Sequence, residues 1–237
     1  MTAATPARAE SEVWNAWNAQ GREKELDDLS DRYSREILRW LDALGRRDLN
    51  ILEVGCGAGW MCERMAQYGS VTGIDHADEV IARASQRMPH ITFAAGDFLA
   101  MDFPDASFDA IVNIEVLSHV ADQPAFMAKI ARLLKPGGML MMATQNRPVL
   151  ERNKVPPADG WIRDWVSREE LRALAAPHFA IREMFTVVPR AKEGPMRLFA
   201  SYKLQALLNP LTGNGYRGLL ERLGHGWSIM CLAQKPG

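Results

Sequence analysis

The sequence is poor in cysteine, in long apolar runs and in excess charge, and each shortage excludes a class of protein. Its 237 residues include three cysteines and no CxxC pair, so we expect neither a disulfide framework nor a cysteine-based metal site. No stretch approaches the ~20 apolar residues that a membrane-spanning helix needs. The formal net charge of −1 gives no general electrostatic reason to bind nucleic acid or an anionic membrane.

Other missing patterns narrow the expectation further. The five histidines are scattered and lack the spacing of a metal site, so we expect no metal. The start, MTAATPARAESEVW, has no apolar core of a secretory signal. No basic strip interleaved with aromatic residues predicts a nucleic-acid groove. We therefore expect a cytoplasmic monomer or homodimer that acts on a small molecule and has neither nucleic acid nor membrane as a partner.

What the sequence does contain is a regular alternation of strand and helix patterns. Seven short apolar segments predict strands, at residues 51–54, 71–75, 91–97, 108–114, 139–145, 180–188 and 227–234. Helical spacing predicts helices at residues 25–44, 60–68, 78–88 and 126–134, and a capping-box pattern opens another at Ser167. Asp78 is placed to cap the helix that it begins. The alternation predicts an α/β fold: a Rossmann-like sheet of seven mostly parallel strands, the last antiparallel, with helices on both faces.

We expect residues 1–237 to form one domain with two helical additions. Residues 1–45 would be an N-terminal helical cap and residues 46–188 the core. The segment 189–226 is too long for a hairpin turn and carries helical patterns, so it would be a helical cap inserted before the last strand, 227–237. The insert is not especially basic, which argues against a role at a membrane surface.

A glycine-rich turn, ILEVGCGAGW, follows the first predicted strand. Such a turn lies at the carboxyl end of the strand, where ligands bind in open parallel sheets. The dinucleotide fingerprint wants glycine at position 60, which is Trp60, and the Gly-Lys-Ser/Thr phosphate loop is absent. A pyrophosphate-binding helix start is therefore disfavoured. The pattern that stands instead is Glu-x-Gly-x-Gly-x-Gly, from Glu53 to Gly59.

This turn and the motifs after it, between residues 50 and 146, resemble those of class I S-adenosylmethionine (SAM)-dependent methyltransferases. Within that family, the histidine context described below is similar to the ubiquinone-type and small-molecule O-methyltransferases. Asp75 closes the second strand, Gly96-Asp97-Phe98 the third, and EVLSHV (115–120) and LLKPGG follow the fourth. The resemblance implies that SAM is the cofactor and S-adenosylhomocysteine (SAH) the product. It also implies that Asp75 binds the ribose hydroxyls, Asp97 the adenine amine, and the backbone N–H of Phe98 a ring nitrogen.

The remaining cofactor-binding candidates surround the same strand ends: Glu53, Gly55, Cys56, Gly57, His76 and Asn113. The glycines allow the backbone to approach the amino-acid and ribose parts of SAM, which carries no phosphate. The sulfonium of SAM is a cation, so a site beside Glu53 and aromatic faces suits it. Cys56 would contribute backbone rather than sulfur chemistry.

Methyl transfer from a sulfonium is an in-line displacement that needs the acceptor atom ~3 Å from the methyl group. A hydroxyl or ammonium acceptor must also lose a proton, so a nearby base helps. His119, just after the fourth strand, is the candidate, either as base or as a residue that orients the substrate. Related enzymes usually have a second Glu before this histidine, and here Ser118 stands in its place, so a carboxylate-assisted role does not carry over.

Aromatic residues outside the sheet predict an enclosed pocket for a flat or apolar acceptor. The substrate-contacting candidates are Trp14, Trp17, His119, Trp161, Trp165 and Tyr202. The alternative for each tryptophan is that it pins a helix onto the domain.

Together these observations favour SAM-dependent methylation of a small molecule, most simply at an oxygen. N-methylation of a small amine or heterocycle and C-methylation of an activated ring carbon remain open. A further alternative is that the protein binds SAM without catalysing methyl transfer. The Asn/Asp-Pro-Pro-Tyr/Phe and Pro-Cys motifs of DNA methyltransferases are absent.

Overall fold

The computed structural model describes residues 7–19, 28–156, 163–192, 196–213 and 215–237. Its centre is a seven-stranded sheet in the order β3-β2-β1-β4-β5-β7-β6. The strands are β1 (Leu49–Val54), β2 (Gly69–Asp75), β3 (Thr92–Ala95), β4 (Phe108–Ile114), β5 (Leu134–Gln145), β6 (Ala180–Pro189) and β7 (Gly226–Gln234). Only β7 runs antiparallel to its neighbours β5 and β6. The expected Rossmann-like fold is thereby confirmed.

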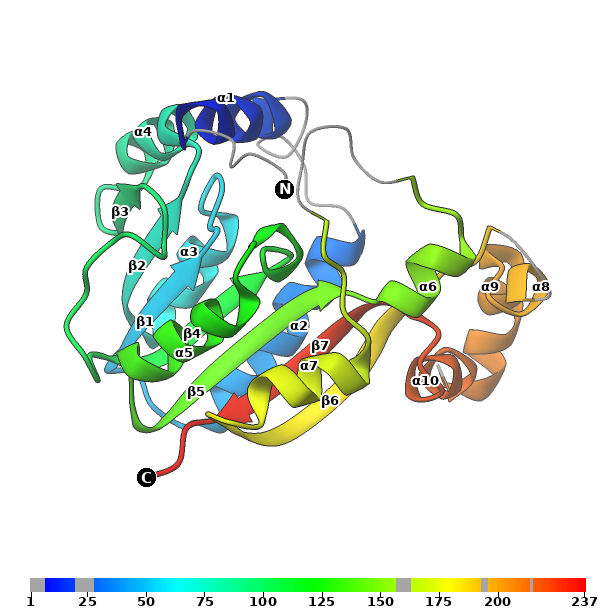
Figure 1. Ribbon diagram of the computed structural model, residues 1–237. Coiled ribbons are helices and arrows are strands. Elements are labelled where there is room, and N and C mark those ends of the chain that lie inside the picture. Colours follow the sequence, from blue (N-terminus) through cyan, green and yellow to red (C-terminus); the bar gives the residue numbers. More distant parts are fainter. Residues whose placement is uncertain (1–6, 20–27, 157–162, 193–195, 214) are drawn as a thin grey trace.

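Helices cover both faces of this sheet (Figure 1). The helices of the body are α1 (Ala7–Trp17), α2 (Asp28–Ala43), α3 (Trp60–Met65), α4 (Asp78–Arg87), α5 (Gln123–Leu133), α6 (Arg147–Arg152) and α7 (Arg168–Ala175). Short 3₁₀ turns follow α3 at Ala66–Tyr68 (η2) and β4 at Leu117–His119 (η3). One apolar cluster joins α2, α3 and α4 to the sheet, and a second joins α5 and α7 to the other side. The central strands are therefore buried on both faces, which explains why their sequences are mostly apolar.

The bounds of several elements differ from the prediction by a few residues: β3 covers Thr92–Ala95 rather than 91–97, and α5 begins at Gln123 rather than residue 126. Two local predictions are wrong for a physical reason. The fifth strand begins at Leu134 rather than residue 139, because Leu134 already pairs with Phe108 of β4. The Lys135-Pro-Gly-Gly segment that follows bulges out of this pairing, and Gly137 and Gly138 are hydrogen-bonded to Lys235. Asp78 does not cap α4: the N-cap is Ala77, without a side-chain cap. The Asp78 carboxylate instead accepts hydrogen bonds from α1, described below. The capping box that opens α7 at Ser167 is confirmed.

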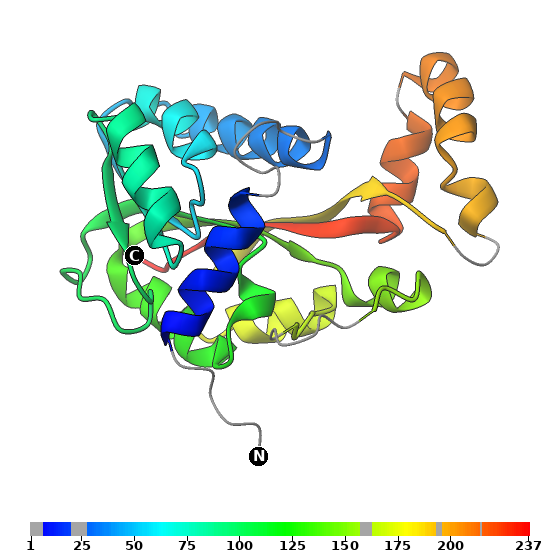
Figure 2. The same cartoon turned by 90° about the horizontal axis from the view of Figure 1, so that it is seen from above.

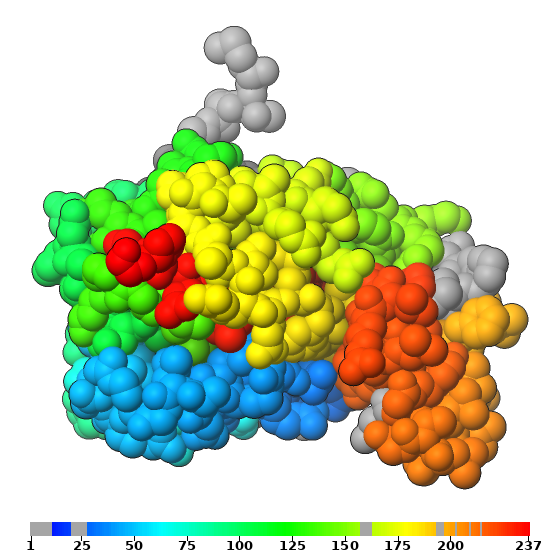
Figure 3. Space-filling model, turned by 90° about the horizontal axis from the view of Figure 1, so that it is seen from below, coloured from blue at the N-terminus to red at the C-terminus, as the bar shows by residue number. Residues whose placement is uncertain are grey.

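The insert between β6 and β7 is helical, as expected, and consists of α8 (Met196–Phe199), α9 (Tyr202–Thr212) and α10 (Gly215–Arg222). It stands at one end of the molecule beside β6, whereas α1 crosses the carboxyl ends of the central strands (Figures 1 and 2). The space-filling view shows α9 and α10 as a lobe at that end (Figure 3). No helix in the described parts of the chain is long and apolar enough to cross a membrane.

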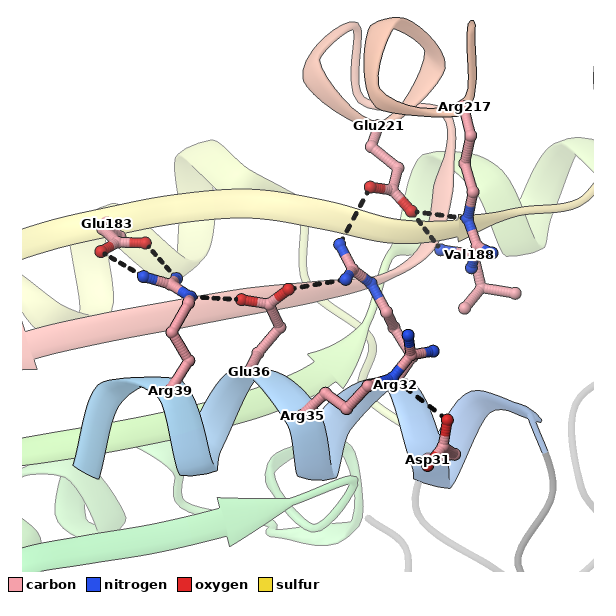
Figure 4. A network of polar contacts seen from close by, with 9 residues as sticks. All are labelled: Asp31, Arg32, Arg35, Glu36, Arg39, Glu183, Val188, Arg217 and Glu221. Carbon is pink, nitrogen blue, oxygen red and sulfur yellow. Dashed lines mark hydrogen bonds and ion pairs between the residues drawn. The ribbon is translucent and has the colours of Figure 1, made fainter. Parts of the chain in front are cut away.

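An ionic network fixes the insert to the body (Figure 4). Glu221 of α10 is 7% exposed, and its carboxylate accepts hydrogen bonds from Arg32 of α2, at 3.2 Å, and from Arg217, at 3.1 Å. The backbone N–H of Val188 donates to the same carboxylate at 3.2 Å. Next along α2, Arg39 donates to Glu183 of β6 at 2.7 Å. Because a buried charge is stable only when it is paired and hydrogen-bonded, α10 has a defined position on the body.

Candidate functional site

The glycine turn after β1 is held against the end of β2 by Asp75. One carboxylate oxygen of Asp75 accepts the backbone N–H of Gly57 at 2.8 Å, and the other accepts that of Ala77 at 2.9 Å. The backbone N–H groups of Gly55 and Cys56 donate to the carbonyl of Ile74. The turn and the carboxylate are thus one hydrogen-bonded unit. Each carboxylate oxygen retains acceptor capacity for a further donor, such as a hydroxyl.

Two glycines of this turn are required for different reasons. Gly55 has φ +76°, and a Cβ there would lie 2.1 Å from Cγ2 of Val116, so the segment after β4 packs directly on its backbone. Gly57 has φ +50°, and a Cβ there would meet only Asn18 within 4 Å, with its Oδ1 at 3.1 Å. The face of Gly57 is therefore open to a ligand except where the segment after α1 covers it.

Glu53, at the end of β1, is buried with 2% of its surface exposed. Its Oε2 accepts a hydrogen bond from the Cys62 thiol at 2.9 Å. Burial raises the pKa of the Glu53 carboxyl to about 8; the thiol hydrogen bond opposes this rise, and the charge of Asp75 adds to it. Glu53 therefore holds its proton at neutral pH while no cation lies beside it. Cys56 and Cys62 are buried here as well, and their thiol pKa values are raised.

Three predicted adenine-site residues meet at the ends of β2 and β3. His76 Nε2 lies 3.9 Å from Oδ1 of Asp97, and that oxygen accepts the backbone N–H of Leu99 at 2.9 Å. The Phe98 side chain packs in the core, 5.1 Å from the ring of Phe126. Its backbone N–H donates to none of the described residues. This edge therefore offers a half-exposed carboxylate and a spare N–H donor next to each other.

Asn113 sits on β4 and is fully buried. Its side-chain N–H donates to the carbonyl of Val54 at 3.2 Å. Its side-chain oxygen is buried and has no partner among the described residues. Asn113 thus ties the end of β4 to the end of β1, directly beside the glycine turn.

Helix α1 closes over this edge of the sheet. Ser11 and Asn15 donate to one carboxylate oxygen of Asp78, at 2.6 and 2.7 Å. Between them, Trp14 packs against the small apolar cluster of Ala58, Ala77 and Val80, which joins the glycine turn to the start of α4. The view from above shows α1 lying across the ends of the central strands (Figure 2).

Trp14 also contacts His119. The two rings meet edge to face, with centroids 4.8 Å apart and planes at 79°. His119 ends η3, whose backbone is held by Gln123: its amide donates to the carbonyls of Leu117, at 3.2 Å, and Asp164, at 2.8 Å. One tryptophan therefore bridges the predicted cofactor edge and the predicted catalytic histidine.

A further group near this edge was not singled out from the sequence. Glu115, directly after β4, has φ +60°, an uncommon conformation for a residue with a side chain. Its carboxylate accepts a hydrogen bond from Tyr33 of α2 at 2.5 Å, and the same phenol bonds Ser228 of β7 at 2.5 Å. The EVLSH motif drew attention to position 115, but the partners come from distant parts of the chain.

The predicted substrate residues are only partly gathered. Trp14 and His119 touch, and Trp17 is 40% exposed at the end of α1. Trp165 lines an open hollow with residues of α5 and α7, next to Asp164, whose N–H donates to the carbonyl of Ser118. Tyr202 begins α9 in the insert, at the other end of the sheet. Trp161 lies outside the described residues. A chamber formed jointly by α1 and the insert stays a prediction.

Comparison with known proteins identifies the family of this chain. Residues 52–142 match a protein family that is described as a methyltransferase domain. The chain is 32% identical over 176 residues to the ubiquinone biosynthesis O-methyltransferase of Cereibacter sphaeroides, covering 68% of this chain and 71% of that protein. This chain belongs to the class I SAM-dependent methyltransferases. It is also 37% identical to the enzyme of the same name from Maricaulis maris over 128 residues, about half the length of that relative.

Solved structures show the same fold. The N-methyltransferase NodS from Bradyrhizobium japonicum, in complex with SAH, has a TM-score of 0.67 at 19% identity, covering 98% of this chain and all of that one. A SAM-dependent methyltransferase from Mesorhizobium loti has a TM-score of 0.61 at 21% identity, covering 83% of this methyltransferase and 96% of its own chain.

Proposed function

We propose that this methyltransferase transfers the methyl group of SAM to an oxygen of a small-molecule acceptor. The observation that carries the proposal is the position of Trp14, which packs on the glycine turn and touches the ring of His119. A methyl donor at the turn and an acceptor beside the histidine would then share one wall. The names of the relatives, O-methyltransferases, support oxygen as the acceptor atom.

The chain's own groups fit SAM at this edge. Asp75 would accept the ribose hydroxyls with its remaining lone pairs, and Asp97 with the N–H of Phe98 would bind the adenine. Gly57 presents bare backbone where the amino-acid part would pass. Glu53 and Asn113 lie behind the turn, with His76 and Cys56 at its sides. When bound, SAM supplies an electrophilic methyl group on a cationic sulfur.

The acceptor side needs a proton acceptor and an anchor. His119 would take the proton of the acceptor hydroxyl, with its ring held against Trp14. Glu115, held by Tyr33, would hydrogen-bond the acceptor and fix its position. Closure of α1 would exclude water from the transferred methyl group. Trp17 and Trp165 would contact the acceptor from the two sides of the opening.

Cofactor binding is tested first, by calorimetry with SAH. Asp75→Asn should lower SAH affinity at least tenfold, because one carboxylate oxygen is replaced by a donor that cannot accept the ribose hydroxyls. Asp48→Asn is the matched control: this exposed carboxylate precedes β1 at the opposite edge of the sheet and should leave SAH affinity unchanged. Equal affinity in both variants would refute the assigned site.

The reaction is tested by SAH release in the presence of a panel of small hydroxylated aromatic acceptors and small amines. His119→Gln should reduce turnover of a hydroxyl acceptor by about 10²- to 10⁴-fold, with SAH affinity kept. An amine acceptor that is neutral at the assay pH needs little help from a base. If the protein methylates only amines, and His119→Gln changes that turnover little, the proposed reaction would be N-methylation instead of O-methylation. SAM binding without methyl transfer to any acceptor, extract fractions included, would indicate a non-catalytic SAM-binding protein.

A further inference from the structure

Exposed apolar side chains concentrate on the insert. Among the described residues, the large apolar side chains that are exposed outside the insert are Trp17 and Leu99. The other six lie on α8, α9 and α10 or directly after them: Leu198, Phe199, Leu207, Leu211, Leu219 and Leu223. We call these six side chains the insert surface. Leu198 and Leu211 are 73% and 77% exposed, values more typical of lysine than of leucine.

The insert surface is not the side by which the insert attaches to the body. The attaching residues of α10 are Leu220, 5% exposed, and Glu221, whose carboxylate is bonded to Arg32 (Figure 4). Leu219 and Leu223 are one helical turn apart, as are Leu207 and Leu211. Each pair therefore forms an apolar strip along its helix that the fold leaves uncovered.

All the exposed charged side chains in the described part of the insert are cations. The exposed cations of residues 189–226 are Arg190, Lys192, Arg197, Lys203 and Arg222. The only carboxylate among the described residues of that segment is Glu221, which is buried and paired. The sequence alone understates this excess of exposed positive charge, because it does not show that Glu221 is buried. The exposed side chains in the described part of the insert therefore include six large apolar groups and five cations but no carboxylate, in a protein with a net charge of −1.

We propose that the insert surface docks on an anionic phospholipid bilayer. Leucine and phenylalanine side chains would enter the boundary between headgroups and acyl chains, and the lysines and arginines would lie at the lipid phosphates. A second copy of the same face would bring cations against cations, which disfavours self-association through it. The net negative charge of the whole protein opposes unspecific adsorption to such a bilayer. Attraction must then come from the insert.

The test uses the full chain in flotation with lipid vesicles, without SAM or acceptor. Binding is expected to vesicles of phosphatidylcholine mixed with phosphatidylglycerol, to be weaker at high salt, and to be absent from phosphatidylcholine alone. Leu207→Ser and Leu211→Ser should each lower the partition coefficient about tenfold. Arg197→Gln and Lys203→Gln should each lower it about fivefold.

Leu99→Ser is the matched control, since it removes an exposed leucine from the body, and it should bind as the unaltered protein does. The substituted side chains of the insert are solvent-exposed, so each insert variant should keep the circular dichroism spectrum and SAH affinity. Failure of the unaltered protein to bind the mixed vesicles would overturn the proposal. The proposal would also be overturned if the insert variants bound the mixed vesicles as well as Leu99→Ser does. It would likewise be overturned if the protein were a dimer that Leu207→Ser dissociates. Loss of methyl transfer activity alone would bear on the proposed function and not on this surface.

Discussion

The buried carboxyl group of Glu53 should make the stability of this protein fall as the pH rises. The pKa of this carboxyl group is about 8 in the folded state, against an ordinary value of 4.5 for glutamate. Between these values the folded protein binds a proton that the unfolded chain does not. The stabilisation is complete below about pH 4.5 and is lost as the pH rises through about 8. At about 1.4 kcal/mol for each pH unit, the free energy of unfolding changes by up to about 5 kcal/mol.

Glu53→Gln removes this titration with little change of shape. The glutamine carbonyl can still accept the hydrogen bond of the Cys62 thiol. The variant should gain stability relative to the unaltered protein as the pH rises, by about 1.4 kcal/mol per unit between about pH 5 and 8. Urea denaturation at several pH values in that interval measures the difference. Tryptophan fluorescence is a suitable signal, because Trp40 is 1% exposed in the core and becomes exposed on unfolding.

The control is Glu79→Gln, which alters a carboxylate that is 71% exposed on α4. Its free energy of unfolding should follow that of the unaltered protein at every pH. Parallel curves for Glu53→Gln and the unaltered protein would refute the reasoning, because they would mean that Glu53 titrates equally in the folded and unfolded states.

Three further substitutions probe the fold and the closure of α1. Gly55→Ala should destabilise the fold by at least about 2 kcal/mol in urea denaturation, because φ is +76° and the new Cβ would overlap Val116; Gly55→Ala combined with Val116→Ala should recover part of the loss. Trp14→Ala should lower SAH affinity about tenfold while the urea midpoint changes little, since α1 packs at the rim of the core; an unchanged affinity would show that α1 does not cover the cofactor. Ser167→Ala should cost about 1 kcal/mol of unfolding free energy by removing half of the capping box, whereas Ser167→Asp should keep most of it.

The strands were predictable where both faces are buried and less so where they are not. The fourth strand was predicted with its observed bounds, 108–114, because a strand covered on both sides is mostly apolar; Asp109 and Asn113 are the polar residues in this one. The start of β5 was missed because Pro136 and Gly137 are residues of turns in most contexts. Pairing with β4 overrode that local preference. The cap of α4 was missed because Asp78 bonds α1, a contact that no local pattern encodes.

The candidate site shows the same division. The sequence placed Asp75 and the glycine turn at one edge of the sheet, because carboxyl ends of parallel strands meet there, and the two are hydrogen-bonded to each other. The group formed by Glu115, Tyr33 and Ser228 could not be predicted, since its members come from β4, α2 and β7 and meet only in the folded chain. The position of the insert was beyond prediction for a similar reason. Helical periodicity shows that a segment is helical but not which surface it packs on.

The antiparallel pairing of β6 and β7 has a consequence for how this molecule can vary. Pro189 and Gly226, at the two ends of the insert, are register partners in adjacent strands. The residues between them therefore leave and re-enter the sheet at one point. Their number does not alter the spacing of any strand. Provided that Glu221 of α10 keeps its bonds to the body, lengthening, trimming or exchanging the rest of this segment costs the sheet little more than a change in loop-closure entropy. The surface that it displays can then change while the edge with the glycine turn keeps its geometry.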